Sequence, residues 1–134
     1  MSVKKISISN FRCFEYIDLE FSELNNFIHG ANGSGKTSIL EALYFCSTGR
    51  SFKSSNKNLC IQNSKEAFKI QLETLSNNKI CILKESKKSI SFKINENSAT
   101  SIELFRTIPS TLLDNKTFSM FADTPTYRRK ILDR

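Results

Sequence analysis

Residues 30–37 read Gly-Ala-Asn-Gly-Ser-Gly-Lys-Thr, and this run matches the pattern G-x-x-x-x-G-K-[ST] at every fixed position. Glycine permits backbone angles that a Cβ forbids, so successive amides of such a run can turn inward and form a nest for an anion. A helix that begins near Lys36 would direct the positive end of its dipole at the same anion. The segment therefore predicts a phosphate-binding loop (P-loop) between a strand and a helix.

The residues on either side of the loop fit this placement. Asn25–His29 is a short, partly apolar run that predicts a strand leading into Gly30. From Thr37 to Ser47 the apolar residues cover most of a helix circumference, which predicts a helix buried against a sheet. The expected fold is therefore α/β, of the P-loop NTPase type.

Each residue of the loop has an expected role with a nucleoside triphosphate, which we take to be ATP. Lys36 is long enough to reach the β- and γ-phosphates, the Thr37 hydroxyl is placed to ligate Mg²⁺, and Ser38 is expected to bond the α-phosphate. The rest of the loop is expected to surround the β-phosphate, chiefly through backbone amides: Gly30, Ala31, Asn32, Gly33, Ser34 and Gly35.

The remaining elements are predicted from alternation and from turn residues. Polar and apolar residues alternate in two N-terminal stretches, from Val3 to Ile8 and from Phe14 to Phe21, as in half-buried strands. An antiparallel meander is expected to form a second, basic layer from strands at Phe68–Thr74, Ile80–Lys84 and Ile90–Ile94. Other expected segments are a loop at Ser51–Asn58, a short helix at Ser98–Arg106, a strand at Thr111–Leu113 and a helix starting at Thr124-Pro125.

The positive charge of the chain is concentrated in one stretch. The 134 residues carry a formal net charge of +7, and residues 53–93 hold nine lysines against Glu66, Glu73 and Glu85, a net +6. A basic stretch of this kind attracts polyanions, of which nucleic acid is the usual one. A solvated, lysine-rich sheet face is an equally good interpretation, and charge alone favours neither.

Cysteine and histidine spacing argues against a zinc site. The four cysteines, at positions 13, 46, 60 and 81, form no Cys-x-x-Cys pair, and His29 is the single histidine. No stretch approaches the roughly 20 apolar residues of a membrane span, and residues 1–10 lack the apolar block of a signal peptide. The expected protein is cytoplasmic, with reduced thiols and no membrane partner.

Four short motifs in sequence order give the chain a family resemblance. They are Asn10-Phe11-Arg12, the P-loop at 30–37, Gly49-Arg50-Ser51-Phe52-Lys53, and Pro125-Thr126-Tyr127-Arg128-Arg129-Lys130-Ile131-Leu132-Asp133. Together they resemble the RecF family of bacterial DNA replication and repair proteins, which are ABC-type ATPases related to SMC proteins. The resemblance extends over all 134 residues.

The resemblance implies a function and a set of partners. RecF-like proteins are ATP-dependent DNA-binding dimers that act at single-stranded or gapped DNA with other recombination-mediator proteins, and two ATP molecules lie between their two heads. It also implies that Arg12 approaches the nucleotide. The ordinary interpretation of Arg12 is a surface residue paired with an acid such as Glu15.

The resemblance also implies that the chain is one domain, the first half of an ATPase head with an incomplete sheet. The signature motif, the acidic strand and the catalytic glutamate of the family find no match, and no run of four apolar residues precedes an Asp-Glu pair. Before the last motif this chain reads Leu113-Asp114-Asn115-Lys116, where the family tends to have Ser/Thr-Pro-Glu. We expect a truncated head that lacks the arm, binds ATP without turnover and has a doubtful ability to dimerise.

Two other functions fit a P-loop. A free-standing kinase or GTPase would need an acidic strand, a lid or a guanine-reading Asn-Lys-x-Asp, and Asn115-Lys116 is followed by Thr117 and Phe118. A gene remnant that neither folds well nor binds nucleotide is the other alternative.

Several residues have two interpretations. Arg50 and Lys53 are interpreted either as DNA contacts or as surface charges, and Arg128 and Arg129 either as DNA contacts or as residues that dock on the head. Glu41 is interpreted either as a helix-surface acid, the more ordinary case, or as a group that supports the nucleotide site from behind. His29 is interpreted as a strand-end residue, with contact to the ligand as the alternative.

Overall fold

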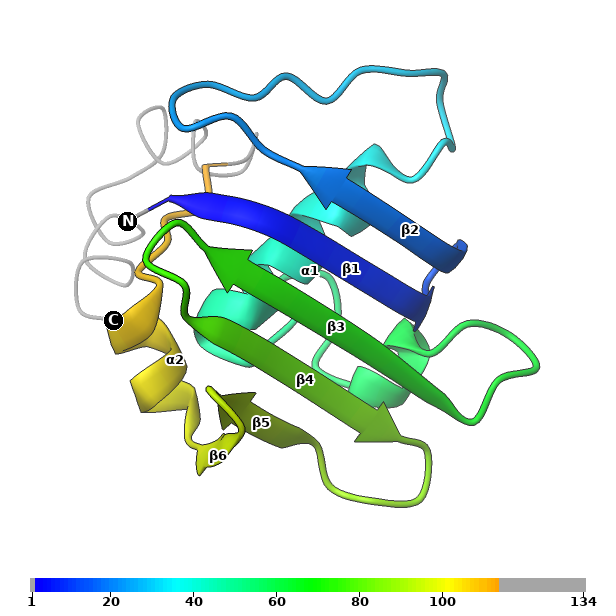
Figure 1. Ribbon diagram of the computed structural model, residues 1–134. Helices are drawn as coiled ribbons and strands as arrows, with labels where there is room; N and C mark the ends of the chain where they lie inside the picture. Colours follow the sequence, from blue (N-terminus) through cyan, green and yellow to red (C-terminus); the bar gives the residue numbers. More distant parts are fainter. Residues whose placement is uncertain (1, 114–134) are drawn as a thin grey trace, which may run out of the picture.

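The computed structural model describes residues 2–113 and contains six strands, two helices and one short 3-10 helix (Figure 1). In chain order they are β1 (Val3–Phe11), β2 (Phe14–Glu20), α1 (Lys36–Thr48), η1 (Lys57–Cys60), β3 (Ala67–Thr74), β4 (Lys79–Glu85), β5 (Ser91–Ile94), β6 (Asn97–Ala99) and α2 (Ser101–Thr107). Among these residues no helix has the length and apolar character needed to cross a membrane.

All six strands form one antiparallel sheet in the order β2-β1-β3-β4-β5-β6. The predicted meander is present, but β3 pairs directly with β1, for example Ile8 opposite Ile70. The prediction of a separate second layer is therefore wrong. The alternation of apolar and polar residues is the same whether a hairpin adds to an existing sheet or starts a new one, so sequence could not distinguish the two.

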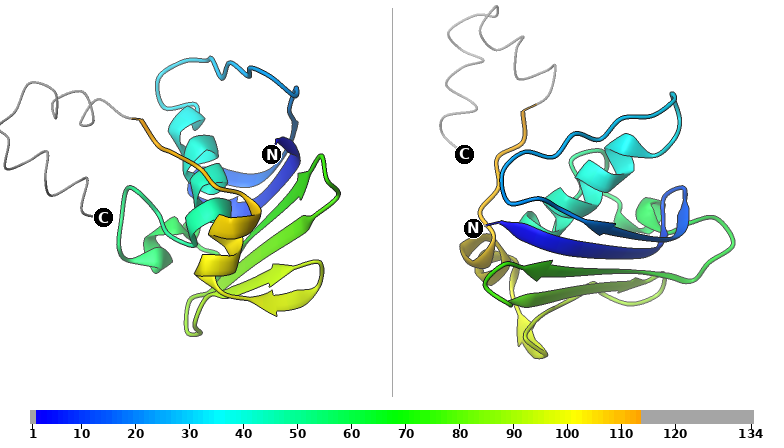
Figure 2. Two further views of the ribbon diagram at one scale, coloured as in Figure 1. Left: turned by 90° about the vertical axis from the view of Figure 1, so that its left-hand side faces the viewer. Right: turned by 45° about the horizontal axis from the view of Figure 1, so that its top comes forward.

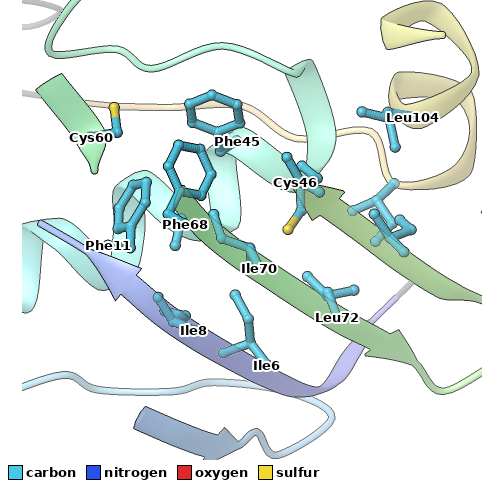
Figure 3. Close-up of a cluster of buried hydrophobic side chains, with 14 residues drawn as sticks. Ile6, Ile8, Phe11, Phe45, Cys46, Cys60, Phe68, Ile70, Leu72 and Leu104 are labelled. Atoms are coloured by element: carbon cyan, nitrogen blue, oxygen red, sulfur yellow. The ribbon is translucent and has the colours of Figure 1, made fainter. Parts of the chain in front are cut away.

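Both helices cover the same face of the sheet, and the other face is open to solvent (Figure 2). The buried residues of the strands alternate along the chain as a half-buried sheet requires. Side chains from three strands meet α1 and Leu104 of α2 in one core (Figure 3). This core confirms that the helix after the P-loop is buried against a sheet.

Three aromatic rings form the end of the core nearest the P-loop. Phe11 of β1 lies 5.0 Å from Phe68 of β3 and 6.4 Å from Phe45 of α1, measured between ring centroids, and all three pairs are edge-to-face. This geometry suits the charge distribution of aromatic rings. The rings join β1, β3 and α1 (Figure 3), and Phe11 is the residue directly before Arg12.

Some predicted elements differ from the structure. Asn25–His29 is not a strand, and Phe27 within it is 89% exposed. A strand exists only by pairing with a neighbour, and no described strand pairs with this segment. Thr111–Leu113 is likewise irregular.

Other boundaries shift by a few residues. The predicted helix at Ser98–Arg106 is divided between β6 and α2, because Thr100 and Glu103 form a capping box that starts α2 at Ser101. The predicted loop at Ser51–Asn58 runs into η1. The helix expected from Thr124-Pro125, the motif at 125–133 and Asp114-Asn115-Lys116 all lie outside the described residues.

Candidate functional site

The P-loop leads directly into α1, and Gly35 is fixed at the junction. Gly35 has φ 93° and caps the N-terminus of α1. A Cβ at this position would collide with the ring of Phe14 and lie 2.8 Å from Sγ of Cys13. Both the backbone angle and the close approach of the β1–β2 turn therefore require glycine.

The side chain of Lys36 folds back over the loop. Its Nζ donates hydrogen bonds to the carbonyl oxygens of Gly30 (2.7 Å) and Ala31 (2.8 Å). The ammonium group is thus placed beside the backbone of the loop, at the N-terminal end of α1. A mobile cation and a helix N-terminus at one point form a site suited to phosphate groups.

A pocket of about 530 Å³ opens at this point. Its lining includes six of the predicted site residues, namely Arg12, Gly33, Gly35, Lys36, Thr37 and Ser38. The other four predicted residues, Gly30, Ala31, Asn32 and Ser34, lie exposed on the loop and do not line the pocket.

Sequence reasoning assigned no part in this pocket to five lining residues: Cys13, Lys53, Leu59, Ile61 and Asn63. Cys13 directly follows the Asn10-Phe11-Arg12 motif, and this position was the one sequence feature that could have indicated a place in the pocket. Lys53, Leu59, Ile61 and Asn63 follow α1, and no local pattern indicated that this stretch returns to the P-loop. A bridge between Ile61 and Phe11 brings it there.

Arg12 does not pair with Glu15, as its ordinary interpretation proposed. Its Nε donates to Oε2 of Glu41 (2.9 Å) and its Nη2 to Oε1 of Glu41 (2.6 Å). Glu15 instead pairs with Lys65. The Glu41 hydrogen bonds raise the pKa of the Arg12 guanidinium above its ordinary value, and they hold this cation in the wall of the pocket.

Glu41 itself is completely buried, so the prediction of a helix-surface acid is wrong. The residue lies on the inner side of α1, four residues before the buried Phe45. His29 is exposed in an irregular segment and does not line the P-loop pocket.

A second hollow lies beside the first, in the loop after α1. Its lining contains three cations, Arg50, Lys53 and Lys57, and no carboxylate. Partial burial lowers the pKa of Lys57, and the nearby charges of Arg50 and Lys84 lower it further. Of these three cations, Lys53 lies 4.0 Å from Oε2 of Glu41, and Arg50 and Lys57 form no ion pair within the described residues.

The solvent face of the sheet is less basic than the sequence suggested. Lys69, Lys79 and Lys93 lie there, and the pairing of strands places Glu73 opposite both Lys5 and Lys79. In the described part of the chain no cluster of three or more His, Cys, Asp or Glu side chains could hold a metal ion, and all four cysteines are free thiols.

Comparison with known proteins agrees with this geometry. The sequence pattern of the AAA domain family matches residues 5–130. The chain belongs to this family. The match spans the P-loop, the sheet and both helices.

Curated relatives confirm the resemblance to the RecF family. The chain is 37% identical to the DNA replication and repair protein RecF of Histophilus somni and 36% identical to that of Clostridium kluyveri, each over 99% of this chain. It spans 38% of the length of each of these relatives.

Solved structures confirm the fold of the family. A structure of the recombination mediator protein RecF with ATP, in the RecFOR pathway, superposes with a TM-score of 0.84 at 28% identity, over 98% of this chain and 38% of that one. A structure from work on ATP-driven dimerisation of SMC ATPases superposes with a TM-score of 0.81 at 19% identity, over 99% of this chain and 98% of that one. The fold is that of the first part of a RecF or SMC ATPase head.

Proposed function

We propose that this chain is the ATP-binding part of a RecF-like protein that acts in DNA replication and recombinational repair. The observation that carries the proposal is the position of Lys36 and the N-terminus of α1 at a pocket with a second cation, Arg12, in its wall. The RecF structure solved with ATP supports ATP as the ligand.

In this proposal the loop residues 30–35 surround the β-phosphate with backbone amides, and Lys36 swings from the carbonyl oxygens of Gly30 and Ala31 to the β- and γ-phosphates. Ser38, although nearly buried, lines the pocket and would bond the α-phosphate. Thr37 is exposed at the pocket and would supply a hydroxyl ligand to the Mg²⁺ that accompanies ATP.

Replacement of Lys36 tests the site. We expect Lys36→Ala to weaken Mg-ATP binding by about 2 kcal/mol, roughly 30-fold, because a charge-assisted contact to phosphate is lost. Calorimetric titration with Mg-ATP measures the change. Lys69→Ala, which removes an exposed lysine from the opposite face of the sheet, is the matched control and should bind as the parent does. Equal affinity of the Lys36 variant and the parent would contradict the proposal.

We further propose that DNA is bound without sequence preference, through phosphate contacts at the loop that carries Arg50, Lys53 and Lys57. The absence of carboxylates from the lining of this hollow supports the placement, whereas on the sheet face Glu73 lies opposite both Lys5 and Lys79. Other recombination-mediator proteins and a second copy of the head are the further partners that the family resemblance implies.

The salt dependence of DNA binding tests this placement. Contacts to phosphate release counterions, so the logarithm of affinity should fall with the logarithm of salt concentration by about 0.9 per duplex phosphate neutralised. Replacing Arg50 and Lys57 by Gln should reduce that slope by about 2. The matched pair Lys69→Gln and Lys93→Gln, on the open face of the sheet, should leave it unchanged. Fluorescence anisotropy across a salt series measures the slope for the parent and for both double variants. An affinity for DNA that is independent of salt would overturn the proposal.

A further inference from the structure

Glu41 is a buried charge with no role in the phosphate site described so far. It is the one fully buried carboxylate among residues 2–113, with 0% of its surface exposed. A buried carboxylate is costly unless its charge is paired and its oxygens accept hydrogen bonds. Its position on α1, five residues after Lys36, places it behind the P-loop pocket.

Three segments of the chain meet at this carboxylate. The guanidinium of Arg12, from the β1–β2 turn, binds both oxygens. The hydroxyl of Ser51, from the loop after α1, donates to Oε1. The thiol of Cys60, at the end of η1, lies 3.9 Å from Oε1, and Nζ of Lys53 lies 4.0 Å from Oε2. The charge of Glu41 is therefore balanced by Arg12 and Lys53, which both line the pocket.

Arg12 is fixed by these contacts with part of its hydrogen-bonding capacity unused. Its Nη1 donates to the carbonyl oxygen of Leu59 (2.8 Å) and its backbone N–H to that of Cys60 (2.8 Å). A guanidinium has five N–H donors, and three of them have partners within the described part of the chain. The other two remain for a ligand in the pocket that Arg12 lines.

Ser51 connects Glu41 to the loop after α1 in a similar way. Its Oγ accepts hydrogen bonds from the backbone N–H groups of Lys53 (2.9 Å) and Ser54 (3.0 Å) while it donates to Glu41. The Lys53 side chain that this turn presents also lines the pocket. One carboxylate thus fixes two cationic walls of the site relative to α1, the helix that carries Lys36.

We propose that Glu41 is a positioning residue for the phosphate site: its carboxylate holds the Arg12 guanidinium so that the two free N–H donors face the bound polyphosphate. The inference rests on the proposed function, because it needs a nucleotide in the P-loop pocket. The two hydrogen bonds from Glu41 matter because a guanidinium that is fixed in advance loses less conformational entropy when it binds phosphate.

A double-mutant cycle in nucleotide affinity tests the inference. Four proteins are titrated with Mg-ATP: the parent, Glu41→Gln, Arg12→Lys, and the double variant. Glutamine keeps the shape of Glu41 but has one acceptor oxygen, so it cannot bind both Nε and Nη2 of Arg12. Lysine keeps the charge of Arg12 but lacks the planar fork. We expect each single change to weaken binding roughly tenfold, and the double variant to bind as Arg12→Lys does.

The cycle separates positioning from a structural role. If Glu41 only stabilises the fold, Glu41→Gln will lower the thermal midpoint without changing affinity below it, and the inference is overturned. Effects that multiply in the double variant would overturn it as well. If Glu41→Gln does not fold, Arg12→Lys still tests the inference. Parent-like affinity of that variant for Mg-ATP would show that the guanidinium held by Glu41 has no part in binding.

Lys36→Ala in the same titration distinguishes the two proposals. If the parent does not bind Mg-ATP, the proposed function fails and this inference fails with it. If the parent binds, Lys36→Ala weakens binding, and the Glu41 and Arg12 variants match the parent, then only the inference about Glu41 is wrong.

Discussion

A polypeptide of these 134 residues should bind Mg-ATP but release phosphate from it no faster than the uncatalysed background. Hydrolysis requires a group that orients the attacking water and fixed donors for the charge that develops on the γ-phosphate. Among the described residues no carboxylate lines the pocket, and both oxygens of the nearby Glu41 are bound to Arg12. Loss of one preorganised electrostatic element costs about 10²- to 10³-fold in rate, so the loss of several should leave no measurable turnover.

A phosphate-release assay on the purified polypeptide measures this, with Lys36→Ala as the control for contaminating ATPases. Steady release that disappears in the Lys36 variant would show that a catalytic carboxylate lies within these residues. Glu41 and Asp114 would then be the first two to replace.

The largest effect on stability is expected for Phe11→Ala. Phe11 is 0% exposed and its ring contacts Phe45 and Phe68, so its removal leaves a cavity where β1, α1 and β3 meet. Such a change typically costs about 3–5 kcal/mol. Domains are stabilised by only about 5–15 kcal/mol, so the variant should lose a large fraction of its stability. Urea denaturation followed by circular dichroism measures the free energy of unfolding.

Phe27→Ala is the matched control for this measurement. Phe27 is 89% exposed, so the same chemical change removes almost no buried surface and should alter the free energy of unfolding by less than about 0.5 kcal/mol. If the two variants lost similar stability, the three rings would not be the central packing contact that the structure indicates.

The elements that sequence predicted well are those defined by local chemistry. The P-loop depends on glycines and a lysine at fixed spacing, and α1 follows it in a single apolar helix from Lys36 to Thr48. Alternation located β1 to β4 to within a few residues, because each strand buries one face only.

The features that sequence missed depend on distant partners. Asn25–His29 has the composition of a strand, but its conformation is decided by whether another strand pairs with it. Arg12 and Glu41 are 29 positions apart, and no local pattern links them. One signal for Glu41 was available, since it lies four residues before Phe45 and therefore on the apolar side of the predicted helix.

The contact between the β1–β2 turn and the P-loop constrains how the two segments can vary. Position 35 excludes other residues for two independent reasons, its φ of 93° and the collision that any Cβ there would have with the ring of Phe14. A smaller side chain at position 14 would remove the second reason and leave the first. Substitutions at 35 therefore have no simple compensating change at 14. Because glycine is required at 35 whatever residue stands at 14, pairwise covariation would not reveal the contact between these two positions.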